Sequence, residues 1–156
     1  MDTSDTIQAF YSAFKNGDTA TMASFYHDEA EFTDPAFGHL KGNEIKMMWK
    51  MLIERSRGNL DIEYTIVDVT SDTALVQWEA RYTFSQTNRP IHNKITARLT
   101  LEDGLIKTHT DRFNLWKWSQ QALGFKGILI GWTPFFRKKL QQKTRKLLHG
   151  YIKQNA

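Results

Sequence analysis

Three side chains of types that transfer protons stand out: Asp34, His109 and Asp111. His109 and Asp111 are separated by one residue in a segment with strand-like alternation, so both side chains should point to the same face of a sheet. A carboxylate beside an imidazole orients the ring and raises its pKa, which gives a proton-transfer pair near neutral pH. The structural alternative is an ion pair or a cross-strand hydrogen bond, with Arg98 or Arg112 as the partner.

Asp34 directly precedes Pro35 and lies close to Phe32 and Phe37. A carboxylate in such apolar surroundings has a raised pKa, because burial disfavours its charged form, and it can then act as a general base. The alternative is a structural role, because an aspartate before a proline commonly accepts hydrogen bonds from the backbone amides of a turn.

The last predicted strand has an irregular pattern. Ile106 and His109 are three residues apart, so they fall on opposite faces of a regular strand. Only a β-bulge between them would turn both side chains inward.

Large aromatic side chains occupy positions that we expect to face inward. As substrate-binding residues they would line a hydrophobic cavity for a ring-containing or acyl molecule. Packing in an ordinary core is the alternative, and aromatic faces at strand spacing favour it. The residues are Tyr26, Trp49, Trp78, Tyr82 and Trp116.

Several kinds of chemistry are excluded by composition. The chain has no cysteine, so it has no disulfide, thiolate metal site or cysteine nucleophile. Its five histidines lack metal-ligand spacing, and no phosphate-binding loop, dinucleotide fingerprint or serine-nucleophile motif occurs. We therefore predict no metal and no cofactor. A mixed site of His109, Asp111 and Asp34 is the less favoured alternative.

The charge is unevenly distributed. Residues 1–114 carry 12 Lys and Arg against 17 Asp and Glu, whereas residues 115–156 carry nine Lys and Arg and no acidic residue. An acidic body with a basic tail does not favour a nucleic-acid partner. The N-terminus has no basic segment followed by an apolar one, so no signal peptide is predicted and we expect a cytoplasmic protein.

Hydrophobic periodicity predicts the elements that position these residues. Helices are expected at 3–15, from 18, and at 42–55, followed by strands at 60–69, 73–84, 91–101 and 105–115. A short strand is expected at 30–33 and further helices at 116–123 and 134–152. This order predicts an α+β fold in which helices pack on the concave face of a cone-shaped, curved antiparallel sheet. The open end of such a cone is a natural pocket for a small molecule.

At this point the chain resembles the nuclear transport factor 2-like superfamily, in particular its SnoaL-like and ketosteroid-isomerase-like branch. The resemblance covers about residues 4–123 and rests on segments 14–18, 25–30, 33–35 and 104–111, with Gly42 opening the third helix. It implies a SnoaL-like domain over residues 1–123. Residues 124–156 would then form a basic helical extension of the same domain.

The resemblance also implies roles for residues. Asp34 matches the general base of the ketosteroid isomerases, and Asp111 matches the acid/base aspartate of SnoaL-like cyclases. Ketosteroid isomerase uses a tyrosine and a protonated aspartate as its oxyanion hole. The matching positions look like Phe10 here, with Tyr11 adjacent, and Thr96. A phenyl ring donates no hydrogen bond, so steroid isomerisation is not expected.

Two functions remain open. The first is a small cofactor-free acid/base enzyme (an isomerase, cyclase, lyase or hydrolase) that acts on a hydrophobic small molecule through Asp34, His109 and Asp111. The second is a non-catalytic ligand-binding or assembly module with the same cone. In either case we expect a homodimer through the outer sheet face, because an exposed sheet of this length tends to aggregate unless another surface covers it.

The C-terminal tail predicts a basic amphipathic helix from Pro134 onward. In the preferred interpretation its apolar stripe covers the body or a partner subunit, because the stripe is short and the glycines at 124, 127 and 131 suit a hinge. In the other interpretation Trp132, Phe135 and Phe136 enter a membrane interface while the basic face meets anionic lipid.

Overall fold

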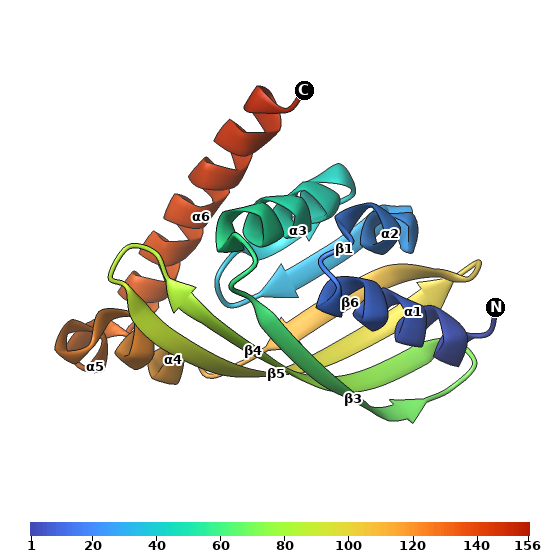
Figure 1. The fold of residues 1–156 in the computed structure, drawn as a ribbon, viewed down its shortest axis with the longest axis horizontal. Coiled ribbons are helices and arrows are strands. Elements are labelled where there is room, and N and C mark those ends of the chain that lie inside the picture. Colours follow the sequence, from blue (N-terminus) through green and yellow to red (C-terminus); the bar gives the residue numbers. More distant parts are fainter.

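The computed structural model describes all 156 residues. A six-stranded sheet with the order β2-β1-β6-β5-β4-β3 curves around α1 and α3, and α6 extends past one end of it (Figure 1). The elements in chain order are α1 (Thr3–Lys15), α2 (Thr19–Ser24), β1 (Tyr26–Asp34), β2 (Gly38–Lys41), α3 (Asn43–Ser56), β3 (Asp61–Val69), β4 (Thr73–Phe84), β5 (Arg89–Glu102), β6 (Leu105–Arg112), α4 (Leu115–Leu123), α5 (Phe125–Ile130) and α6 (Pro134–Gln154).

The α+β architecture is confirmed, with one correction to the sheet. β1 pairs with β6 in the parallel direction, so the sheet is mixed rather than antiparallel. The sequence also missed β2, which pairs antiparallel with β1, and the short helix α5. Both elements are very short, and alternation over four residues carries too little pattern to be recognised.

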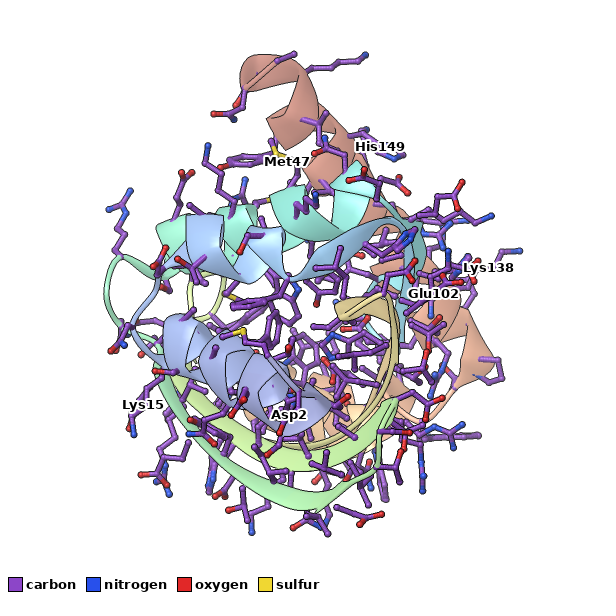
Figure 2. The ribbon with its side chains drawn as sticks, turned by 90° about the vertical axis from the view of Figure 1, so that its right-hand side faces the viewer. Asp2, Lys15, Met47, Glu102, Lys138 and His149 are labelled. Carbon is purple, nitrogen blue, oxygen red and sulfur yellow. The ribbon has the colours of Figure 1, made fainter.

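Helix α1 packs across the concave face as its apolar stripe predicts. Ile7, Phe10 and Phe14 are buried, and the Phe14 ring centroid lies 5.1 Å from that of Trp78 on β4. The helix is capped by Asp2, whose carboxylate accepts from the backbone amide of Asp5. Side chains from the helices and from the sheet meet in the space between the two layers (Figure 2). The concave side is therefore a packed core.

The bulge required in the last strand is present. Thr100 pairs with Thr108 and Leu101 pairs with Ile106, so Lys107 is the extra residue of β6. The same residue is skipped in the pairing with β1. As a result Ile106 and His109 are both buried on the concave side, although their spacing forbids this in a regular strand.

Helix α6 lies against the body, as the preferred interpretation of the tail predicts. Leu148 is fully buried, and the hydroxyl of Tyr151 donates to the carboxylate of Glu54 on α3. Figure 1 shows α6 running beside α3. Phe136, one of the three residues considered for a membrane interface, is buried in a second cluster with Trp118 of α4. None of the helices combines the length and the apolar character that crossing a bilayer requires.

Candidate functional site

Asp34 ends β1, and its carboxylate organises the turn into β2. Its Oδ1 accepts hydrogen bonds from the backbone amides of Ala36 at 3.0 Å and Phe37 at 2.6 Å. Pro35 cannot donate a backbone hydrogen bond, so it starts the turn without an unpaired donor. The structural role considered for Asp34 is therefore observed, and it holds the carboxylate in one fixed position.

The same carboxyl group is chemically unusual. The side chain is half-buried: protein atoms surround it, while part of its surface stays open to solvent. The pKa of Asp34 is raised to about 7: desolvation is the largest cause and the charge of Asp111 adds to it, while the hydrogen bonds from Phe37 and Ala36 oppose the rise. A carboxyl with this pKa can give and take protons near neutral pH.

A continuous series of buried hydrogen bonds connects two tryptophans through a tyrosine, a histidine and an aspartate. The indole Nε1 of Trp49 donates to the hydroxyl of Tyr26 at 2.9 Å, and that hydroxyl lies 2.7 Å from Nδ1 of His109. Nε2 of His109 lies 3.0 Å from Oδ1 of Asp111, which also accepts from Nε1 of Trp78 at 3.2 Å. The predicted contact between His109 and a carboxylate is therefore present.

The donors of this series define part of its hydrogen-bond directions. Trp49 is only a donor, so the hydroxyl oxygen of Tyr26 accepts from it, and Oδ1 of Asp111 likewise accepts from Trp78. Each ring nitrogen of His109 has one buried partner, the Tyr26 hydroxyl at Nδ1 and the Asp111 carboxylate at Nε2.

His109 is enclosed by aromatic rings. Its ring stacks against Tyr26 and Trp49 at centroid distances of 6.1 Å, and Phe10 and Phe32 meet it edge-on. Only 1% of its side chain is exposed. His109 is therefore shielded from solvent, and it can act on a small molecule only through Asp111 or after a movement of the rings.

The aromatic residues predicted to bind substrate divide into three groups. Tyr26, Trp49 and Trp78 belong to the buried core and carry the hydrogen-bond chain. Tyr82 is half-buried and its hydroxyl accepts from Trp118; desolvation raises the pKa of Tyr82, and the charge of Asp34 makes a smaller contribution. The prediction that Trp116 faces inward is wrong: 41% of it is exposed on α4.

Tyr11 is a candidate functional residue that the sequence analysis did not select. It lies on the apolar stripe of α1, and a tyrosine in such a position is expected to belong to the core. Its hydroxyl is fully buried and has no hydrogen-bond partner. Burial raises its pKa well above the ordinary value, with smaller contributions from the charge of Asp111 and from Tyr26. A buried donor without a partner is uncommon in a native structure, because it loses its hydrogen bonds to water without replacing them.

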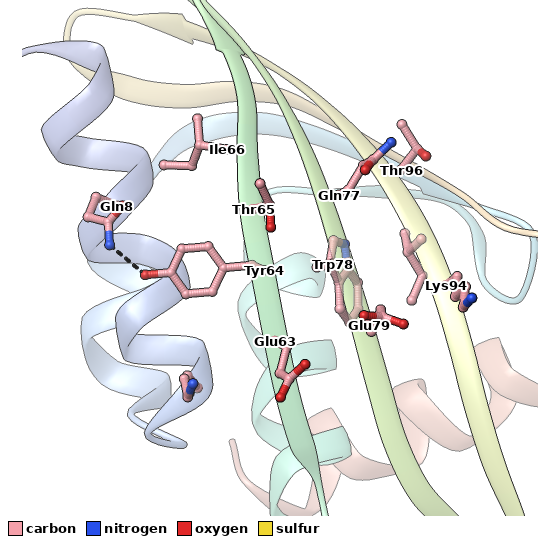
Figure 3. Close-up of a pocket in the computed structure, with 12 residues that line it drawn as sticks. Gln8, Glu63, Tyr64, Thr65, Ile66, Gln77, Trp78, Glu79, Lys94 and Thr96 are labelled. Atoms are coloured by element: carbon pink, nitrogen blue, oxygen red, sulfur yellow. Dashed lines mark hydrogen bonds between the residues drawn. The ribbon is translucent and has the colours of Figure 1, made fainter.

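Two broad hollows lie open on the surface, and neither includes Asp34, His109 or Asp111. One of about 870 Å³ lies over β3, β4 and β5 beside α1, where Gln8 donates to the hydroxyl of Tyr64 (Figure 3). The other, of about 720 Å³, is bordered by Tyr82 and residues of the β4–β5 pair. The three residues expected to act on a small molecule therefore border neither of these two hollows. No group of three metal-ligating side chains occurs in the chain.

The turn that holds Asp34 is itself held by α6. Gln141 donates to the carbonyl oxygen of Pro35, and Thr144 donates to that of Ala36. Arg145 donates to the carbonyl oxygens of Phe37 at 2.8 Å and His39 at 3.0 Å. Periodicity and motifs did not predict this arrangement, because more than 100 residues separate the partners.

Comparisons with known proteins identify the fold and the family. The SnoaL-like domain family matches residues 7–109. A protein assigned as a polyketide cyclase from Xanthomonas campestris pv. campestris is 18% identical, with a TM-score of 0.62 over 76% of this chain and 95% of that one. An LEH-like epoxide hydrolase from M. tuberculosis is 19% identical, with a TM-score of 0.56 over 81% of this chain and 89% of that one.

A third similar structure has a ketosteroid isomerase-like fold and was crystallised in complex with trimethylamine. It comes from Catenulispora acidiphila and is 15% identical, with a TM-score of 0.60 over 83% of this chain and 97% of that one. No curated protein is significantly similar to the chain in sequence. Identities this low indicate a shared fold and leave the reaction open. The family match covers most of the chain, and the chain belongs to the SnoaL-like domain family of the NTF2-like superfamily.

Proposed function

We propose that the protein is a cofactor-free acid/base enzyme of SnoaL-like type, with Asp34 as the group that moves the proton. The observation that supports this most strongly is the position of Asp34: a rigidly held, half-buried carboxylate near a second, buried carboxylate. Its substrate is a hydrophobic small molecule with an acidic C–H bond beside a carbonyl group. Asp34 takes that proton as a carboxylate and returns it to another atom as a carboxylic acid.

The buried residues support Asp34 without touching substrate. Asp111 carries the negative charge that helps to keep the proton on Asp34 near neutral pH. His109 and Trp78 fix the position of Asp111 by their hydrogen bonds. His109 and Asp111 are therefore positioning residues in this proposal, and Tyr82 borders the substrate on the Asp34 side.

Deuterium exchange tests the proposal without knowledge of the product. A panel of hydrophobic ring-containing ketones is incubated with the protein in D₂O, and incorporation of deuterium beside the carbonyl is followed by NMR. Asp34→Asn keeps the two acceptor contacts to the turn but removes the base, so exchange should fall about 10²–10⁴-fold. Asp68→Asn, an exposed aspartate on β3, is the matched control and should exchange as the unaltered protein does.

A non-catalytic ligand-binding module is the second candidate. It is favoured by the dense packing around His109 and by the two hollows that lie away from the aspartates. In that case ligands from the panel bind with the same affinity to the unaltered protein and to Asp34→Asn, and no deuterium enters them. That outcome would reject the enzymatic proposal.

A further inference from the structure

An apolar surface lies at the corner where α4, α5 and the start of α6 meet. Of the nine large hydrophobic residues exposed in the chain, six gather here, and two of them, Phe125 and Phe135, are 74% and 69% exposed. We call this surface the corner patch. It consists of Trp116, Phe125, Ile128, Leu129, Trp132 and Phe135.

Hydrogen bonds and packing hold the corner patch in shape. The indole Nε1 of Trp116 donates to the carbonyl oxygen of Ile128, and that of Trp132 donates to Leu129, both at 3.1 Å. Helix α5 lies so close to α4 that a Cβ at Gly127 would be 2.0 Å from the carbonyl oxygen of Ser119. Both indole donors are satisfied within the protein, so neither ring would bring an unpaired N–H group into an apolar medium.

Positive charge adjoins the corner patch. Four cationic side chains stand next to its residues in the chain or one helical turn away, a fifth, Arg137, follows Phe135 by two residues, and none of the five is in an ion pair. No acidic residue follows Asp111. The five are Lys117, Lys126, Arg137, Lys138 and Lys139.

We propose that the corner patch docks on an anionic lipid surface. Exposed tryptophan and phenylalanine side chains flanked by unpaired Lys and Arg are the combination that binds a membrane interface, because the rings enter the headgroup region while the cations meet anionic lipid. A second copy of the chain fits poorly, because it would bring the same five cations against one another. The contact is peripheral, and it differs from a tail-helix anchor because α6 itself is docked on the body through Leu148 and Arg145.

Vesicle co-sedimentation of the full chain tests this proposal. Phosphatidylcholine vesicles are compared with vesicles that also contain phosphatidylglycerol, at low and high salt. We expect binding to the anionic vesicles that weakens as salt is raised. Absence of binding to the anionic vesicles overturns the proposal, and so does binding of equal strength to both kinds.

Paired variants separate the apolar from the electrostatic contribution to vesicle binding. The double substitution Trp132→Ala and Phe135→Ala removes apolar area and should weaken binding at least about tenfold. Lys126→Gln with Arg137→Gln should weaken it about fivefold per cation. Val67→Ala and Lys94→Gln alter an exposed apolar and an exposed cationic residue on the sheet, and both should bind as the unaltered chain does.

Quenching by lipids with brominated acyl chains locates the contact. Trp116 and Trp132 are exposed in the corner patch, whereas Trp49, Trp78 and Trp118 are buried. Replacing the two exposed tryptophans by phenylalanine should retain most of the binding and remove most of the quenching. Unchanged quenching in that variant contradicts the proposal. Self-association through the corner patch in a chain that binds no vesicle also contradicts it and assigns the surface to a second copy instead.

Discussion

Arg145 lies on the last helix, and its Nε is 2.8 Å from the carbonyl oxygen of Phe37, the residue whose own amide holds the carboxylate of Asp34. The second contact of the guanidinium, to His39, closes the other end of the same turn. The C-terminal helix and the candidate base are therefore joined through one short turn.

Arg145→Ala is expected to lower the pKa of Asp34. Without the guanidinium, α6 loosens from the turn and water reaches the carboxyl group, which reduces the desolvation that raises the pKa. A carbon-detected NMR titration of Asp34 measures the change. Lys146→Ala removes a neighbouring exposed cation that holds no turn carbonyl, and it should leave the pKa near 7.

The stability of the fold should depend on the ionisation of Asp34. The pKa of Asp34 is about 7 in the folded chain and about 3.9 in the unfolded chain, so the folded state holds the extra proton between these values. The free energy of unfolding contributed by this group is therefore greatest below pH 4 and is lost as pH rises towards 7. In urea titrations at several pH values, Asp34→Asn should lack this part of the pH dependence, which amounts to up to about 4 kcal/mol. Parallel curves for the two proteins would show that the carboxyl titrates normally.

Removal of the Tyr26 hydroxyl should destabilise the fold. Tyr26→Phe leaves the indole of Trp49 without an acceptor and Nδ1 of His109 without a partner, and both groups are buried. Each unsatisfied group costs about 1–3 kcal/mol, so a loss of about 2–6 kcal/mol in unfolding free energy is expected. Tyr64→Phe is the control. Its hydroxyl meets only the exposed Gln8, and its loss should cost less than about 1 kcal/mol.

Replacement by alanine should change the stability of the fold in opposite directions at two glycines of the C-terminal region. Gly127→Ala forces a Cβ into the backbone of Ser119, and such overpacking should cost at least about 2 kcal/mol. Gly150 lies within α6 with nothing near its Cβ position, so Gly150→Ala should stabilise the chain by about 0.5–1 kcal/mol. Thermal unfolding of both variants shows whether each substitution raises or lowers the stability. A destabilised Gly150→Ala would mean that α6 does not adopt its helix in solution.

The long elements could be predicted from sequence because each repeats one pattern over many residues. The bounds of α1 and of β4 agree with those expected, and the spacing of Ile106 and His109 indicated that both could face inward only through a bulge, which β6 contains. The parallel partner of β1 could not be predicted, because strand direction within a sheet depends on how distant segments meet. Alternation within β1 is the same for either direction.

The candidate site was predictable by residue type but not by geometry. Asp34, His109 and Asp111 are recognisable as proton-transferring groups, but nothing in their spacing tells that His109 is enclosed by rings while Asp34 keeps contact with solvent. The partners Tyr26 and Trp49 were expected to contact a ligand. Instead the Tyr26 hydroxyl is the partner of Nδ1 of His109, and Trp49 donates to that hydroxyl, because a buried imidazole needs a partner for each nitrogen. The homodimer remains a prediction.

The pairing of β1 with β6 sets a condition on when the domain can form during synthesis. Tyr26 of β1 lies beside Ile106 of β6, 80 residues later in the chain. As the ribosome produces the chain from its N-terminus, β1 can join β2 in a hairpin, but its other edge stays unpaired until β6 has emerged. Because closing such a long loop precedes the contacts that stabilise it, folding should be slow for a domain of this length. The nascent chain therefore passes through a period with an open strand edge, during which a chaperone or a neighbouring nascent chain can occupy it.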